Sequence, residues 1–204
     1  MAAPTAKPCD YDAGYLDYQL RRNWLRRFIR GFYLRHIRRL ATGPCLDFGC
    51  GTGDLLRHLP PGSLGLEVNP ATVAFGQTAG LPVLQYDPDQ DRYALAGLTP
   101  GRFACLILSH VLEHLSPADR ILATLAASAG RLGMQRLILV VPGAKGFAHD
   151  PTHQEFIDLH YLRTRHLLDL PPFRLTRHHW FPLNAERAGR IFTHNELVLI
   201  FYRL

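Results

Sequence analysis

The feature that most constrains this chain is a run of alternating glycines, Gly49, Gly51 and Gly53, which follows a short apolar segment. Residues 45–48 are typical of a buried strand, and residues 54–59 are typical of a short helix. Glycine lets the backbone turn sharply and approach a ligand closely. In a parallel sheet such a turn lies at the carboxyl end of the strands, where ligands bind. We therefore expect a ligand-binding loop between the first strand and the first helix.

The rest of the chain alternates short apolar runs with helical stretches. We expect further strands over residues 63–68, 82–86, 103–109 and 136–141, and helices over residues 71–78, 117–132 and most of 153–170. A closing pair of strands is expected over residues 173–180 and 196–202. Alternation at this spacing predicts an α/β fold, in which helices cover both faces of a parallel sheet.

The segment over residues 1–42 differs from the domain expected over residues 43–204. It carries nine basic and three acidic residues, whereas the rest of the chain is balanced, so the net charge of +6 belongs to this segment. Helical spacing predicts a helix over residues 14–41, with a possible break at Gly31. Its expected apolar face, which we predict to pack on the core, consists of Leu25, Phe28, Ile29 and Phe32.

The arginines of this helix leave three interpretations open. They can be solvated while the helix acts as a structural cover. They can form a face that docks RNA. The helix can also lie on an anionic membrane surface, since aromatic residues alternate with its arginines.

Composition favours a cytoplasmic protein. The chain has four cysteines without a C-x-x-C pair, which predicts buried free thiols in a reducing compartment. No apolar run reaches the length of a membrane span, and residues 1–9 lack the pattern of a secretory signal. The sequence gives no indication of the oligomeric state.

The glycine spacing argues against a dinucleotide. A G-x-G-x-x-G fingerprint would need glycine at position 54 or 56, where Asp54 and Leu56 stand. An acid at a helix start would also repel a pyrophosphate. A phosphate-binding G-x-x-x-x-G-K loop is absent from the sequence as well.

The stretch from Asp47 to Gly53 instead resembles the D-x-G-x-G-x-G motif of class I S-adenosylmethionine-dependent methyltransferases. Residues 65–68 (GLEV) end the second strand with an acid, and residues 86–88 (YDP) follow the third. Residues 108–115 (LSHVLEHL) at the end of the fourth strand resemble the S-x-V-L-E-H-L segment of that family. The four matches occur in the order of the family's strands.

The resemblance implies a Rossmann-like, seven-stranded methyltransferase core preceded by a helical segment, with S-adenosylmethionine as cofactor. In the family, an acid at the position of Glu67 holds the ribose, and one near Asp87 reads the adenine. Ser109 and His110 would flank the methionine portion, and Tyr11 or Tyr15 would close over the site. The expected cofactor contacts are Asp47, Gly49, Cys50, Gly51, Gly53, Glu67, Val68, Asp87, Ser109 and His110.

Two competing motifs are less favourable. Residues 110–114 match H-x-x-E-H, but His110 and His114 begin at a strand end, so they do not share a helix face as that zinc motif requires. We therefore expect no bound metal. Asn69-Pro70 stands after the second strand without a following aromatic residue, which argues against methylation of nucleic-acid bases on nitrogen.

The loop after the fifth strand borders the acceptor side in this family. Its residues 153–156 resemble a family H-x-x-F pattern, and His153 is the candidate general base for a hydroxyl acceptor. No recognition domain is inserted, so a small molecule, such as a saccharide or metabolite hydroxyl, is the first choice of acceptor. The alternatives are RNA or protein docked on the basic helix, or a non-catalytic S-adenosylmethionine-binding module.

Overall fold

The computed structural model describes residues 24–204, with side chains from residue 31 onward. Several expectations lie outside this range. They concern Tyr11, Tyr15 and Arg22, and the side chains of the expected apolar face that precede residue 31.

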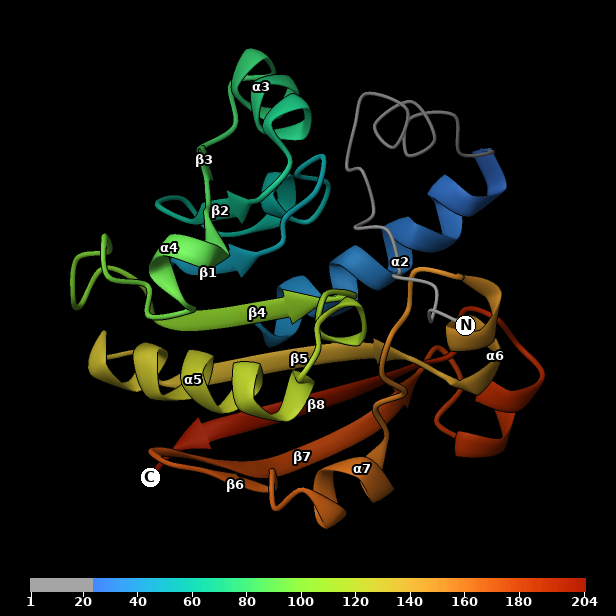
Figure 1. Cartoon of the computed structure of the whole chain (residues 1–204). Helices are drawn as coiled ribbons and strands as arrows, with labels where there is room; N and C mark the ends of the chain where they lie inside the picture. Colours follow the sequence, from blue (N-terminus) through green and yellow to red (C-terminus); the bar gives the residue numbers. More distant parts are fainter. Residues whose placement is uncertain (1–23) are drawn as a thin grey trace, which may run out of the picture.

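Within the described residues, eight strands form one sheet in the order β3-β2-β1-β4-β5-β8-β7-β6 (Figure 1). The first five strands are parallel, and β8 pairs antiparallel with both β5 and β7. The strands are β1 (Cys45–Phe48), β2 (Leu64–Glu67), β3 (Val83–Gln85), β4 (Cys105–Ser109), β5 (Arg136–Pro142), β6 (Asp169–Leu170), β7 (Phe173–Phe181) and β8 (Glu196–Arg203). The predicted α/β fold and its closing pair of strands are confirmed; the pair is antiparallel, and the two-residue β6 is an addition at the edge.

Helices and short 3-10 turns connect the strands. The α-helices are α2 (Trp24–Leu40), α3 (Pro70–Thr78), α4 (Pro88–Asp91), α5 (Ala118–Arg131), α6 (Ala144–His149) and α7 (Leu159–Thr164). The 3-10 turns are η1 (Leu56–His58), η2 (Leu112–His114) and η3 (Glu186–Arg190). None of the helices in the described part of the chain is both long enough and apolar enough to cross a membrane.

The core forms two layers because successive strand residues point to opposite faces of the sheet. On β4, Leu106 and Leu108 join the cluster that α5 covers, whereas Cys105 and Ile107 join the cluster that α2 covers. Figure 1 shows α5 along one face of β4 and β5, with α2 passing on the other. The described cysteines, Cys45, Cys50 and Cys105, are buried free thiols, as predicted.

The buried face of α2 differs from the prediction. Phe32 is 51% exposed, while Tyr33, Leu34 and Ile37 are buried against the sheet. Phe32 is the one residue of the expected face whose side chain is described, and its exposure corrects the prediction at that position, because the apolar residues of α2 spread over more than one face. The helix also runs through Gly31 without a break.

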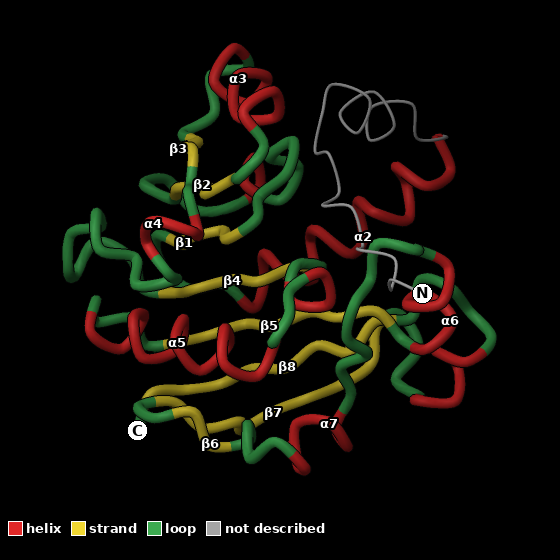
Figure 2. Tube along the Cα trace, in the orientation of Figure 1, coloured by secondary structure: helices red, strands yellow, loops and turns green. Residues whose placement is uncertain are grey.

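Two helical predictions were too long. The stretch over residues 54–59 forms only η1, and most of 153–170 is not helical, since α7 covers Leu159–Thr164 alone. The loop before α7 instead bonds to η2, with the Gln154 amide donating to the Glu113 carbonyl at 2.7 Å. The Asp158 side chain then starts α7 by accepting from the Tyr161 amide at 2.7 Å. Figure 2 shows this long irregular stretch between α6 and α7.

Candidate active site

The glycine loop follows β1 at the carboxyl edge of the parallel strands. Gly49, Gly51 and Gly53 have φ angles of 70°, 54° and 77°, which lie in the left-handed region that favours glycine. A Cβ atom at Gly49 would stand 2.5 Å from Cγ2 of Val111, the residue that follows His110. The alternation therefore lets the backbone turn tightly and pass close to the segment after β4.

Glu67, at the end of β2, fixes the shape of this loop. Its Oε2 accepts from the Gly51 amide at 2.8 Å, and its Oε1 accepts from the Asn69 amide at 2.9 Å. The carbonyl of Leu66 accepts from the amides of Gly49 and Cys50 at 2.8 and 3.0 Å. Each carboxylate oxygen of Glu67 keeps a second lone pair for a ligand. The acid is thus both a loop support and a candidate ligand contact.

The other expected contacts near β1 and β2 differ in exposure. Asp47 is buried beneath the loop, and Val68 is 38% exposed at the sheet edge. Cys50 points inward, since a Cβ atom at Gly65 would stand 2.5 Å from its sulfur. Only the backbone of Cys50 is therefore placed to face a ligand.

Asp87 is exposed after β3 and caps α4. Its Oδ1 accepts from the amides of Asp89 and Gln90 at 2.9 and 3.1 Å, and its Oδ2 accepts from the Gln90 side chain at 2.8 Å. It lines an open cavity with Leu66 and Tyr86, beyond the ends of β2 and β3. The residue stands at the expected edge, but its carboxylate is already engaged in capping.

Ser109 ends β4 and His110 follows it, and both contact Tyr33, a residue that sequence analysis missed. The hydroxyls of Tyr33 and Ser109 lie 2.5 Å apart, and the rings of Tyr33 and His110 have centroids 5.8 Å apart. Tyr33 comes from α2 and is buried. The expected cover was Tyr11 or Tyr15, and helical spacing did not single out Tyr33.

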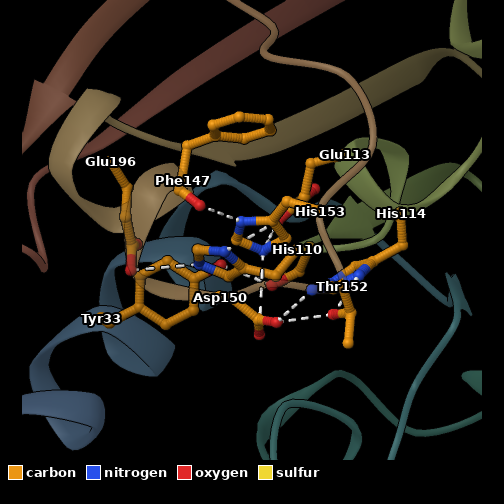
Figure 3. Close-up of polar contacts among 10 residues, drawn as sticks. Tyr33, His110, Glu113, His114, Phe147, Asp150, Thr152, His153 and Glu196 are labelled. Carbon is orange, nitrogen blue, oxygen red and sulfur yellow. Dashed lines mark hydrogen bonds and ion pairs between the residues drawn. The ribbon is translucent and has the colours of Figure 1, made fainter. Parts of the chain in front are cut away.

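His110 lies between two carboxylates (Figure 3). Its Nδ1 is 3.3 Å from Oε1 of Glu113, and its Nε2 is 3.1 Å from Oε1 of Glu196. Burial opposes a charge on the imidazole, but Glu196 and Glu113 outweigh it and raise the pKa of His110 to about 10. At neutral pH His110 is therefore an imidazolium.

His153 presents one nitrogen to Glu113 and to a further acid, Asp150. Its Nδ1 is 2.8 Å from the carbonyl oxygen of Phe147, which can only accept, so Nδ1 carries the proton. Its Nε2 lies 3.9 Å from Oε1 of Glu113 and 4.0 Å from Oδ2 of Asp150. The Phe147 ring stacks on the imidazole with centroids 5.2 Å apart. These contacts fix the orientation of His153 on the loop between α6 and α7.

His114 is oriented by a short relay. The Thr152 hydroxyl donates to Oδ1 of Asp150 at 2.6 Å, so its oxygen accepts from Nδ1 of His114 at 3.1 Å. Burial lowers the pKa of His114, which favours the neutral imidazole. The rings of His114 and His153 meet edge to face with centroids 4.6 Å apart.

The structure therefore joins three predicted residues, His110, His153 and Ser109, with partners that no spacing revealed. Glu113, the acid of the 110–114 motif, lies between His110 and His153 at the centre of the cluster. Glu196 begins β8, far along the chain, and only the antiparallel pairing of β5 with β8 brings it to His110.

Comparison with known proteins identifies the family. A family model described as a methyltransferase domain matches residues 21–197, so the chain belongs to this family. The resemblance to class I S-adenosylmethionine-dependent methyltransferases is thereby confirmed, and the chain is identified as a methyltransferase. No curated protein matches the sequence.

Solved structures share the fold at low sequence identity. A SAM-dependent methyltransferase from Archaeoglobus fulgidus is 18% identical, with a TM-score of 0.67 and coverage of 94% of this chain and 100% of that one. Magnesium protoporphyrin IX methyltransferase from Synechocystis PCC 6803, with bound SAH, is 17% identical, with a TM-score of 0.66 and coverage of 95% and 96%. The cyclase SpnF is 16% identical, with a TM-score of 0.58 and coverage of 90% and 84%.

Proposed function

We propose that this chain transfers the methyl group of S-adenosylmethionine to a hydroxyl of a small-molecule acceptor. The observation that carries the proposal is the hydrogen bond from the Gly51 amide to the Glu67 carboxylate at the carboxyl edge of the sheet. It joins the glycine loop to an acid that would bind the vicinal hydroxyls of a ribose. The Synechocystis methyltransferase that shares this fold holds SAH, the product of such a transfer.

The residues around the loop fit this cofactor. The backbone of Gly49, Gly51 and Gly53 would pass beside it where a side chain would collide. Glu67 would accept from the ribose hydroxyls with its remaining lone pairs. Asp87 would meet the adenine amino group while it still caps α4. Ser109 and His110 would lie beside the methionine portion, with Asp47 supporting the loop from below.

The bound cofactor supplies an electrophilic methyl group on a sulfonium centre. The acceptor oxygen forms the new bond to carbon as the bond from sulfur breaks, and the hydroxyl proton leaves. We propose His153 as the group that takes this proton, because its Nδ1 is held by the Phe147 carbonyl and its Nε2 keeps a lone pair. In-line positioning by the loop would contribute the rest of the acceleration.

An acceptor docked on the basic helix is the second candidate. Arg35, Arg38 and Arg39 are exposed on α2, and they give that helix a positive surface that suits RNA or an acidic protein. Exposed Phe32 on the same helix also suits an anionic membrane surface. Fold does not fix function, so the turnover assay below distinguishes these acceptors and a non-catalytic module.

The test is a turnover assay with labelled S-adenosylmethionine and fractionated pools of hydroxyl compounds. Turnover is measured as the release of S-adenosylhomocysteine. We expect label in a small-molecule fraction, and none with Gly51→Val. Label found only in RNA or protein would favour the second candidate. Binding without turnover on any pool would favour the non-catalytic module.

A further inference from the structure

Three metal-ligating side chains converge beside the proposed acceptor position. One ligand atom each from Glu113, His114 and His153 lies within 4.8 Å of the other two. Glu113 and His114 come from η2, while His153 comes from the loop after α6. Figure 3 shows these side chains turned toward one another.

The hydrogen bonds of both imidazoles leave a lone pair on Nε2. His153 donates from Nδ1 to the Phe147 carbonyl, and His114 donates from Nδ1 to Thr152, whose own proton goes to Asp150. Histidines that bind metal are held in this way, since the second nitrogen donates to a carbonyl or to a group linked to a carboxylate. The cluster therefore contains outer hydrogen bonds that suit a metal site.

Glu113 supplies an independent observation. Its side chain is fully buried, and neither carboxylate oxygen has a hydrogen-bond partner among the residues that the structure describes. Its nearest charged neighbour is His110, whose Nδ1 is 3.3 Å away and whose Nε2 faces Glu196. The ion pair with His110, which is shared with Glu196, leaves both Glu113 oxygens without a hydrogen bond, and a buried carboxylate in that state favours a further cation.

The charges of the cluster point the same way. Three acids, Glu113, Asp150 and Glu196, lie within 4.0 Å of the imidazole of His110 or His153. A divalent cation would balance the excess of negative charge. It would also bridge the Nε2 atom of His153 and Oε1 of Glu113, which present lone pairs to each other across 3.9 Å.

We propose that Glu113, His114 and His153 bind one divalent transition-metal ion, with zinc as the best match to two imidazoles and one carboxylate. Ligand atoms around zinc stand about 3.4 Å apart, so the three side chains would draw together on binding. Sequence analysis predicts no metal because the H-x-x-E-H motif pairs His110 with His114, and these two do not share a helix face. In the structure, His110 pairs with Glu113 and Glu196, and His153 lies beside His114.

This inference rests on the proposed function and changes how His153 acts in it. A metal ion and the acceptor proton would use the same Nε2 lone pair, so His153 cannot serve both at once. With the ion bound, the acceptor hydroxyl would lose its proton more readily, as water does on zinc. The proton would pass to solvent water, the methyl group to the oxygen, and the bonding pair to sulfur.

The experiment is calorimetric titration of the metal-stripped full chain with zinc, and visible absorption after loading with Co²⁺. We expect one equivalent to bind. Affinity should fall by at least ~10-fold in His114→Ala, His153→Ala and Glu113→Gln, because each removes a ligand. The matched control is His149→Ala, which removes an exposed histidine of α6 outside the cluster and should bind as the wild type does. Circular dichroism checks folding, and Co²⁺ spectra of the wild type test the site without any variant.

Absence of stoichiometric zinc and Co²⁺ binding to the wild type would overturn the site, as would unchanged affinity in folded His114→Ala. Binding of S-adenosylhomocysteine is measured in parallel. If the metal binds without the nucleoside product, the proposed function fails and the metal site stands. If the nucleoside product binds without the metal, this inference fails and the proposed function stands.

Discussion

The Gly51 amide donates to Oε2 of Glu67 across 2.8 Å, so the end of β2 sets the shape of the loop that follows β1. The same carboxylate accepts from the backbone amide of Asn69, and the side chain of Asn69 caps α3. One buried acid thus ties together the loop, the end of β2 and the start of α3. Its remaining lone pairs stay available for the ligand that the loop is expected to hold.

Replacement of Glu67 should affect stability and cofactor binding together. Glu67→Ala leaves the Gly51 and Asn69 amides without an acceptor, which should cost about 2 kcal/mol of unfolding free energy. It should also weaken binding of S-adenosylhomocysteine. Chemical denaturation and calorimetry measure the two effects. Glu67→Gln is the control, since it keeps one oxygen acceptor and should lose less stability. Equal stability of the alanine variant and the wild type would refute the role of Glu67 in the loop.

The charge on His110 predicts a pH dependence of stability. Its pKa rises from 6.5 to about 10 in the folded protein, because the acids outweigh burial. The resulting stabilisation is fully present below about pH 6.5 and declines as pH rises toward 10. Melting temperatures across this window should fall in the wild type more than in His110→Gln. Parallel curves for the two proteins would contradict the ion pairs with Glu113 and Glu196.

Removal of His153 tests the chemistry on the acceptor side. For a hydroxyl acceptor, His153→Ala should lower turnover by ~10² or more and leave cofactor affinity nearly unchanged. His114→Ala separates the two ways in which His153 can act. If His153 takes the proton directly, His114→Ala keeps most of the turnover. If both bind a metal ion, the two variants lose comparable activity. Full turnover in His153→Ala would return this residue to a structural role.

The helix α2 should be required for a folded protein. Tyr33, Leu34 and Ile37 are buried against the sheet, so deletion of residues 1–42 should give an unstable or poorly soluble chain. Reversal of Arg22, Arg26 and Arg30 to glutamate should leave folding intact. Loss of vesicle binding in that variant would indicate a membrane surface, and loss of RNA retention would indicate nucleic acid. A truncated chain that stays folded and active would contradict the packing role.

The sequence was sufficient to predict the sheet and the loop because their signals are local. The apolar runs and the glycine alternation from Gly49 to Gly53 each lie within a few residues. The helix expected over most of 153–170 failed for a tertiary reason. At the start of this stretch the Gln154 amide donates to the Glu113 carbonyl in η2. Helical spacing carries no information about that partner.

The cluster around Glu113 could be predicted only in part. The likeness to a family segment placed Ser109 and His110 at the end of β4. The meeting of His114 with His153, and of His110 with Glu196, depends on how β5 and β8 pair and on where the loop after α6 returns. Tyr33 was missed for the same reason, since α2 is distant from Ser109 in the sequence and meets it only in the folded protein.

Binding of S-adenosylhomocysteine to the purified chain tests the central claim most directly. At ~100 times its dissociation constant it should raise the unfolding free energy by ~2.7 kcal/mol and release measurable heat. Gly51→Val should abolish both effects, because residue 51 has a φ of 54° and a branched side chain would enter the cofactor's space. A wild-type chain that gives neither heat nor a shift in melting temperature would contradict the account.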